Sequence, residues 1–401
     1  MDDLSFADTK LLNKIRWSWP WLWRYPLWRL RKLAHRLTES SEPGHLILLV
    51  ANHFEPGLGP EGLTRVKAWS RLARTTGDAV RDHDDTPFRH TNFFPAEQYE
   101  RPILDVLSAL QADGYGEVEI HLHHGVERPD TAANTRSVLE EFRDVLAERH
   151  GCLSRRNPDS SPRYAFVHGN WALANSAGGR FCGVDNEMQI LADTGCYADF
   201  TLPSVPFQTQ VPRINAIYQC GHPLSEARPH RSGPNLAVGD KPELPIIFTG
   251  PLVFDWSRRI RGLPIPRIDD GALAQNYPLS LNRFASWRSA RIGVIGRPDW
   301  HFIKLFSHGF FESDQDIMIG EQLKRLMGEV MELAEQTGGF KIHFASAREA
   351  FNMVVAAVDG RKGNPNDYRD YRLRQIMKEI RHAARDAGQL TSPAGSTIMV
   401  G

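Results

Sequence analysis

The most constraining feature of the sequence is a nearly continuous apolar run, residues 45–51 (HLILLVA), which stops abruptly at the polar, turn-rich residues 52–57 (NHFEPG). A strand that is apolar on both faces is typical of a parallel sheet covered by helices. The order of apolar strand, polar turn and amphipathic helix recurs along the chain. The sequence therefore predicts an α/β protein with a parallel sheet, either open or closed into a barrel.

A second predicted strand, residues 117–125 (EVEIHLHHG), is rich in histidine. Side chains alternate between the two faces of a strand, so His121 and His123 share one face with Glu117 and Glu119. Two imidazoles on one face at a strand end are well placed to hold a metal ion; solvated histidines at a polar strand end are the alternative. His124 falls on the other face, and we expect it to be a surface residue or to support the ligands indirectly.

Other predicted strands also end in unusual polar residues, and parallel α/β sheets carry their functional sites at these ends. The residues at the strand ends are His53 and Glu55, His121 and His123, His168 and Asn170, Asp199, and His308. Imidazoles and carboxylates bind zinc or a similar divalent ion, and a catalytic site uses three of them and leaves one position open. The predicted metal ligands are His53, Glu55, His121 and His123.

The remaining strand-end residues are candidates for acid–base chemistry. We expect His308, on the far side of the site, to protonate a leaving group. The candidates for the base are Glu55, Asp185, Glu187 and Asp199. Glu187 stands at a predicted helix start, where helix capping is the alternative role, and His168 has the alternative of a hydrogen-bonded core histidine. Lys304 would need a buried partner, for which we expect Glu119.

Composition narrows the class of protein. Lys and Arg together number 48, equal to Asp and Glu, so the chain lacks the net basic charge of a general nucleic-acid binder. The four cysteines include no Cys-x-x-Cys pair, which favours reduced thiols in a cytosolic protein. We expect no membrane-spanning segment and no secretory signal, because no apolar run is long enough.

Residues 13–37 form an aromatic and basic arm. They hold five of the ten tryptophans and several Lys and Arg residues, without one acidic residue. Such a mixture suits a membrane interface, with rings at the headgroups and cations against anionic lipid. An arm packed across the main domain or a second subunit is the alternative. Pro20 and Pro26 predict short helical pieces.

The order of motifs resembles the glycoside hydrolase and polysaccharide deacetylase superfamily, which includes chitooligosaccharide deacetylases and class II α-mannosidases. Residues 52–57 (NHFEPG) resemble its first-strand motif, residues 117–124 its histidine motif, and residues 305–309 (LFSHG) its last motif. Residues 167–173 (VHGNWAL), 182–187 (CGVDNE) and 195–204 (GCYADFTLPS) resemble deacetylase-like proteins of exopolysaccharide gene clusters. The resemblance covers roughly residues 45–360.

The resemblance implies an irregular seven-stranded (β/α) barrel over residues 43–360, preceded by the arm (1–42) and followed by a C-terminal helix and tail (361–401). It implies a zinc-dependent hydrolase that removes an N- or O-acyl group from a polysaccharide, an oligosaccharide or a lipid-linked precursor, at the cytoplasmic face of the membrane. We expect His308, Glu187 and Asp199 to be catalytic. The predicted substrate contacts are His168, Asn170 and Trp171.

The sequence departs from the family in two places. No Asp-Asp pair stands at the first strand, and residues 168–171 (HGNW) replace the arginine-containing third motif. The deacetylase base is therefore not where the family has it. A mannosidase-type glycosidase and a sugar-binding barrel without catalysis remain alternatives.

Overall fold

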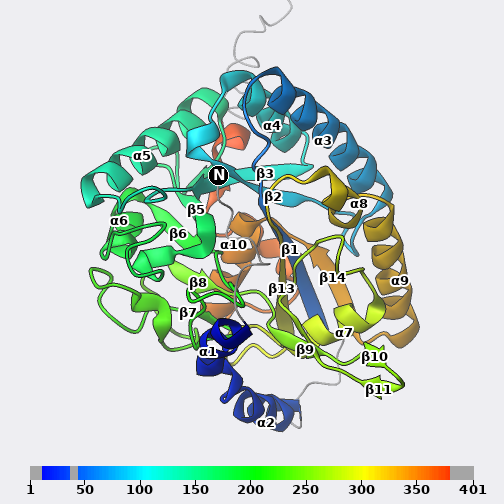
Figure 1. The fold of residues 1–401 in the computed structure, drawn as a ribbon. Coiled ribbons are helices and arrows are strands. Elements are labelled where there is room, and N and C mark those ends of the chain that lie inside the picture. The colour runs from blue at the N-terminus through cyan, green and yellow to red at the C-terminus, as the bar shows by residue number, and fades with distance from the viewer. Residues whose placement is uncertain (1–10, 37–43, 380–401) are drawn as a thin grey trace, which may run out of the picture.

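The computed structural model describes residues 11–36 and 44–379 (Figure 1). Its centre is a nine-stranded, mostly parallel sheet in the order β13-β1-β2-β3-β5-β6-β8-β7, with β14 paired to β1 and β7 antiparallel to β8. Its strands are β1 (Gly44–His53), β2 (His90–Pro95), β3 (Gly116–Leu122), β5 (Tyr164–His168), β6 (Cys196–Asp199), β7 (Ile217–Tyr218), β8 (Ile246–Phe248), β13 (Trp300–Ser307) and β14 (Phe340–Phe344).

Helices cover the outside of the curved sheet (Figure 1). They are α3 (Gly59–Ala79), α4 (Arg101–Ala112), α5 (Ala132–Asp144), α6 (Glu187–Thr194), α7 (Leu281–Ser289), α8 (Gln315–Met318) and α9 (Glu321–Thr337). This arrangement confirms the predicted α/β class with a parallel sheet. The hydrogen-bonded order of the described strands begins at β13 and ends at β7, and no hydrogen-bonded pairing joins these two ends.

The first strand occupies a branch point of the sheet. Along one edge β1 pairs with β13 over residues 45–52. Along the other edge its first half pairs with β14 and its last three residues pair with β2. Eight of the ten residues of β1 are buried, which explains the apolar run in the sequence.

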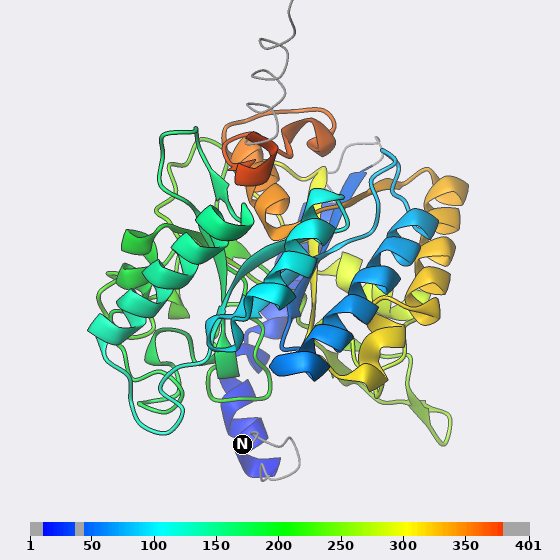
Figure 2. The ribbon, with the colours of Figure 1, turned by 90° about the horizontal axis from the view of Figure 1, so that it is seen from above.

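A fully buried helix, α10 (Ala347–Val358), lies at the N-terminal end of the strands, opposite the arm (Figure 2). Its Arg348 donates hydrogen bonds to both carboxylate oxygens of Glu117 in β3, at 3.0 and 2.9 Å. Asp370 lies 2.5 Å from the same guanidinium. A buried charge needs such partners, because desolvation otherwise outweighs its attractions.

The interior face of β3 is polar along its whole length. Glu119 accepts hydrogen bonds from the Tyr197 hydroxyl and the Ala165 amide, both at 2.6 Å. The expected Lys304–Glu119 pair is therefore wrong. Lys304 instead donates to the carbonyls of Phe200 and Leu202, at 2.6 and 2.8 Å, and so links β13 to the segment after β6.

The arm forms two short helices, α1 (Leu11–Leu22) and α2 (Tyr25–Arg36), as predicted. The break between them lies just before Pro26, whereas Pro20 lies inside α1 and does not break it. Trp21 is fully buried against Val205 and Leu252, whereas Trp19 and Trp23 are 62% and 54% exposed. In the expected C-terminal helix and tail, residues 361–401, η7 (Pro365–Tyr368) and β15 (Arg374–Gln375) come first, and the helix begins at Ile376. Residues 380–401 lie outside the described residues.

Short elements complete the description. The remaining strands are β4 (Ser154–Arg155), β9 (Val253–Asp255), β10 (Arg259–Ile260), β11 (Leu263–Pro264) and β12 (Arg267–Asp269), and the remaining helical turns are η1 (Ala96–Gln98), η2 (Val145–Arg149), η3 (Gly169–Trp171), η4 (Leu173–Asn175), η5 (Pro229–Arg231) and η6 (Glu312–Asp314). Pairing of β15 with β4 attaches residues 374–375 to the main domain.

Replacing Arg348 should be far more destabilising than replacing an arginine at the surface. We expect Arg348→Ala to lower the free energy of unfolding by about 3–5 kcal/mol, because it leaves Glu117 buried without its partner. Arg372→Ala, which breaks a partly exposed pair with Asp359, should cost less than about 1 kcal/mol. Denaturant unfolding followed by circular dichroism measures both; equal losses would contradict this interpretation.

Candidate metal centre

The C-terminal ends of the strands bring several predicted residues together. His53 is the last residue of β1, His121 is the penultimate residue of β3, and His308 directly follows β13. The parallel register aligns these ends, because Asn52 lies opposite Ser307 and Pro95 lies opposite His121. The strand ends therefore meet in space as the sequence predicts.

His53, Glu55 and His121 form what we call the first cluster, with His123 at its rim. The His121 Nε2 atom lies 3.4 Å from Glu55 Oε1, and His123 Nε2 lies 3.9 Å from the same oxygen. The ring centroids of His53 and His121 are 4.9 Å apart. One ligand atom from each of His53, Glu55 and His121 lies close enough to the others to share a metal ion.

Hydrogen bonds outside the first cluster set its charge state. His121 Nδ1 lies 2.8 Å from the Val167 carbonyl, which only accepts, so Nδ1 carries a proton and Nε2 is the ring nitrogen that faces Glu55. His121 Nε2 and Glu55 Oε1 are both buried and have no hydrogen-bond partner. When His121 is neutral, these two atoms are acceptors that face each other, an arrangement that fits a bound cation. His123 Nδ1 lies 2.5 Å from Glu97, the pairing that commonly orients a metal-binding histidine.

The pKa shifts favour an anionic Glu55 and a neutral His53. Burial lowers the pKa of His123, but the hydrogen bond to Glu97 and the charge of Glu55 raise it more. Burial raises the pKa of Glu55, but the hydrogen bond and charge of His121 lower it more, to about 2. Burial keeps the pKa of His53 well below its usual value. A deprotonated carboxylate and neutral imidazoles are the forms that bind a divalent ion.

A pocket of about 460 Å³ adjoins the first cluster, and His308 and Trp171 line it. The two rings stack with centroids 4.5 Å apart and planes 23° apart, and His308 lies 5.6 Å from His53, centroid to centroid. Trp171 also stacks on Phe207. Aromatic faces of this kind can hold a sugar ring. Asn170 sits beside Trp171 with a φ of 53°, in the left-handed region that asparagine tolerates.

The structure places His168 and Glu187 away from the first cluster. Glu187 is fully buried; it accepts a hydrogen bond from the Ala174 amide at 2.6 Å, and its Oε1 atom lies 2.8 Å from His124 Nε2. His168 lies 3.4 Å from the same carboxylate. These contacts occupy Glu187 within a group that we call the second cluster: His124, His168, Cys182 and Glu187. His124 is buried in it, so the expectation of a surface residue is wrong.

Asp199 is also buried, at the end of β6. Its carboxylate accepts hydrogen bonds from the Thr201 amide and hydroxyl, at 3.1 and 2.7 Å. Burial raises its pKa to about 7. Asp199 therefore contacts Thr201 and not the imidazoles of the first cluster.

The sequence analysis did not predict two carboxylates near the site, those of Glu97 and Asp270. Glu97 lies in η1, a turn after β2, and contacts His123 across the strand ends. Asp270, after β12, lines the same pocket as His308, and burial raises its pKa to about 6. Both come from loops. The Asp269-Asp270 pair was the only sequence signal for the second of them.

A third group, Asp82, Asp84 and His343, has ligand-like spacing but is satisfied internally. Asp82 accepts hydrogen bonds from the amides of Asp84, Thr86 and Phe344. Arg369 supplies a positive charge 3.3 Å from it. This group therefore closes a turn and does not need an ion.

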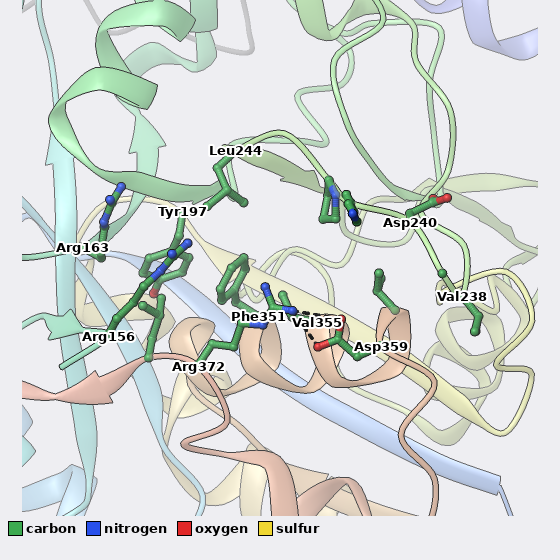
Figure 3. Close-up of a pocket in the computed structure, with 15 residues that line it drawn as sticks. Arg156, Arg163, Tyr197, Val238, Asp240, Leu244, Phe351, Val355, Asp359 and Arg372 are labelled. Atoms are coloured by element: carbon green, nitrogen blue, oxygen red, sulfur yellow. Dashed lines mark hydrogen bonds and ion pairs between the residues drawn. The ribbon is translucent and has the colours of Figure 1, made fainter. Parts of the chain in front are cut away.

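A larger cavity than the pocket of the first cluster lies between α10 and the starts of β5 and β6 (Figure 3). It measures about 570 Å³ and is lined by Arg156, Arg163 and Arg372 together with apolar Phe351 and Val355. The Arg372 guanidinium is paired with Asp359 at 2.7 Å. The cavity lies at the N-terminal end of the strands, and none of the histidines of the first cluster lines it.

Comparisons with known proteins leave the family open: no protein-family model matches the chain, and no curated protein does. The resemblance to deacetylases therefore rests on the motifs quoted above.

Among residues 11–36 and 44–379, no helix is both long and apolar enough to cross a membrane.

Removing one ligand or its orienting partner should weaken metal binding by different amounts. We expect His121→Gln to abolish binding at the first cluster, and Glu97→Gln to weaken it about 10- to 100-fold because His123 loses its orienting carboxylate. Titration of the metal-stripped protein with Zn²⁺ measures these affinities. Glu61→Gln, an exposed change on α3, is the control. Unchanged binding in His121→Gln would exclude the site.

Proposed function

We propose that this protein is a metal-dependent hydrolase that removes an acyl group from a carbohydrate. The observation that carries the proposal is the unpaired, buried pair His121 Nε2 and Glu55 Oε1 beside a pocket that also contains His308. A metal ion fits between His121 Nε2 and Glu55 Oε1. The pocket beside them contains a proton donor, His308, and aromatic side chains. The competing arrangement is an ion pair between Glu55 and a doubly protonated His121, and the Zn²⁺ titration described above distinguishes the two.

The residues that would hold the ion are His53, Glu55 and His121, with His123 as a fourth candidate. A bound divalent ion such as zinc would supply Lewis-acid polarisation of the acyl carbonyl. His53 has a strongly lowered pKa and stays neutral as a ligand. Glu97 holds the proton of His123 Nδ1 and so directs Nε2 toward Glu55.

The pocket side chains would perform the proton transfers and hold the sugar. His308 would donate a proton to the leaving group, stacked on Trp171, which fixes the plane of its ring. Asp270 is our candidate for the base in place of Glu187 and Asp199, because it lines the pocket and ionises near neutral pH. Phe207, which also lines the pocket, would contact the sugar, whereas Trp171 already stacks on both His308 and Phe207.

Two features support the finer prediction of an irregular barrel. Lys304 joins β13 to the backbone after β6, and the ring of Phe248 in β8 contacts Phe302 in β13 at 5.5 Å. Side chains thus fill the gap between the two ends of the sheet. We propose an incomplete barrel in which these contacts replace a final pair of hydrogen-bonded strands.

The exposed residues of the arm support the proposal that the substrate lies at a membrane surface. Exposed apolar side chains lie among exposed cations on α1, on α2 and in the turn between them: Leu12, Trp19, Trp23 and Leu27 beside Arg16, Arg24 and Arg29. Trp21 anchors the arm against Val205, which also lines the pocket beside the first cluster. We propose that the arm binds anionic lipid at the cytoplasmic face and holds the pocket near a lipid-linked glycan.

Acyl release from acetylated oligosaccharides should depend on both pocket residues. We expect His308→Ala and Asp270→Asn each to lower kcat/KM for acetate release at least about 100-fold. The wild-type rate should rise as the pH passes through about 6, because Asp270 loses its proton there and the ionised form is the base. His222→Ala, which changes a histidine bonded to Arg231 and Ser232, should keep full activity.

The products of the same assay separate the alternatives. Release of reducing sugar without acetate would favour a mannosidase-type glycosidase. Binding of oligosaccharide with neither product would favour a sugar-binding protein. Either result contradicts deacylation.

The exposed tryptophans of the arm should control lipid binding. We expect the wild type to sediment with vesicles that contain phosphatidylserine, and the double variant W19A/W23A to remain largely in the supernatant. The variant V238A/I295A removes exposed apolar side chains beside the arginine-lined cavity and should sediment like the wild type. Equal sedimentation of both variants would exclude a membrane role for the arm.

A further inference from the structure

The second cluster has the composition of a zinc site and lies apart from the pocket. His124 follows β3, His168 ends β5, Cys182 lies in the loop before α6, and Glu187 is the first residue of α6. His168, Cys182 and Glu187 are fully buried, and His124 is nearly so. Three regions that are separate in the sequence, around residues 124, 168 and 182–187, thus bring these four side chains together.

Three acceptor atoms converge at this point. His124 Nε2 lies 2.8 Å from Glu187 Oε1 and 3.0 Å from His168 Nε2, and His168 Nε2 lies 3.4 Å from Glu187 Oε1. Two atoms bound to one zinc ion at about 2.0–2.1 Å in tetrahedral geometry lie about 3.3 Å apart. The three separations are close to that value.

Outer hydrogen bonds place the imidazole protons on the far sides of the rings. His124 Nδ1 lies 2.9 Å from Asp130 Oδ2, and His168 Nδ1 contacts the Gly169 carbonyl. Both of these oxygens accept, so each histidine donates from Nδ1 and presents its Nε2 lone pair to Glu187. A carboxylate or carbonyl behind each imidazole is the usual support of a zinc-binding histidine.

The backbone holds Cys182 against the other ligands. Its carbonyl accepts from the Asp130 amide at 2.8 Å, and the Phe181 amide donates to the Gly125 carbonyl at 2.9 Å. A Cβ atom at Gly125 would overlap the backbone of Cys182, so only glycine fits there. The Cys182 sulfur lies 3.7 Å from Glu187 Oε2 and 3.4 Å from the Val184 amide, which can stabilise a thiolate.

We propose that His124, His168, Cys182 and Glu187 bind a zinc ion that fixes the loops around the first cluster. Two imidazoles, a thiolate and a carboxylate are a soft and borderline donor set that suits zinc. All four ligands come from the protein and the site is closed to solvent, so the ion is structural. It ties His124 in place, and with it the adjoining His123 of the first cluster.

The competing arrangement replaces the ion with a proton. Burial lowers the pKa of His124, but the carboxylates of Glu187 and Asp130 raise it more, and the result is well above the usual value. A protonated His124 would satisfy Glu187 without any metal. The two arrangements differ at Cys182, because only the ion gives its sulfur a metal bond.

Cobalt substitution of the full-length protein tests the proposal. Co²⁺ bound by Cys182 should give the near-ultraviolet absorption of thiolate-to-cobalt charge transfer, which the cysteine-free first cluster does not produce. We expect Cys182→Ser to abolish this band and to reduce the metal content by one ion per chain. Cys196→Ser, a change at another fully buried cysteine, should retain both.

Further measurements keep the test independent of folding and of the first cluster. X-ray absorption of the zinc-loaded wild type should show a sulfur ligand at about 2.3 Å. His121→Gln should keep the cobalt–thiolate band although it loses the ion of the first cluster. Absence of both the band and the sulfur ligand in the metal-loaded wild type, or a band that survives in Cys182→Ser, would overturn the proposal.

Discussion

The structure depends on satisfying a polar strand face inside an apolar interior. β3 turns Glu117, Glu119 and His121 into the space within the sheet, and each of these groups would be costly to bury alone. Arg348 neutralises Glu117 at one end of the strand, and Tyr197 donates to Glu119 in the middle. Only at the C-terminal end does an acceptor, His121 Nε2, remain unpaired. The same strand therefore provides an anchor at one end and a ligand at the other.

The alternation of side chains along β3 also separates the two clusters. His123 turns toward Glu55 and Glu97, whereas His124 turns toward His168 and Glu187. Gly169 allows the two groups to approach, because a Cβ atom there would overlap the ring of His123. Neighbouring residues in the chain thus belong to two different polar centres. Rigidity in the second cluster limits how far His123 can move in the first.

Strand ends were the part of the site that sequence reasoning could predict. The parallel pattern and period of two were enough to bring His53, Glu55 and His121 together, and His308 beside them. The contacts of Glu187 and Lys304 were harder to predict, because their partners depend on how distant loops fold back over the sheet. Glu97 and Asp270 lie in such loops, and no local pattern marks their positions. The closure of the sheet depends on side chains such as Lys304, which carry no periodic signal.

The branch point at β1 has a consequence for biosynthesis. This strand is made early, yet its neighbours β13 and β14 lie about 250 to 300 residues later in the chain. During synthesis, β1 cannot form its hydrogen bonds with β13 and β14 until nearly the whole chain has been made. Unpaired apolar strands of this kind aggregate readily. We expect truncated forms that lack β13 and β14 to expose residues 45–51 and to aggregate.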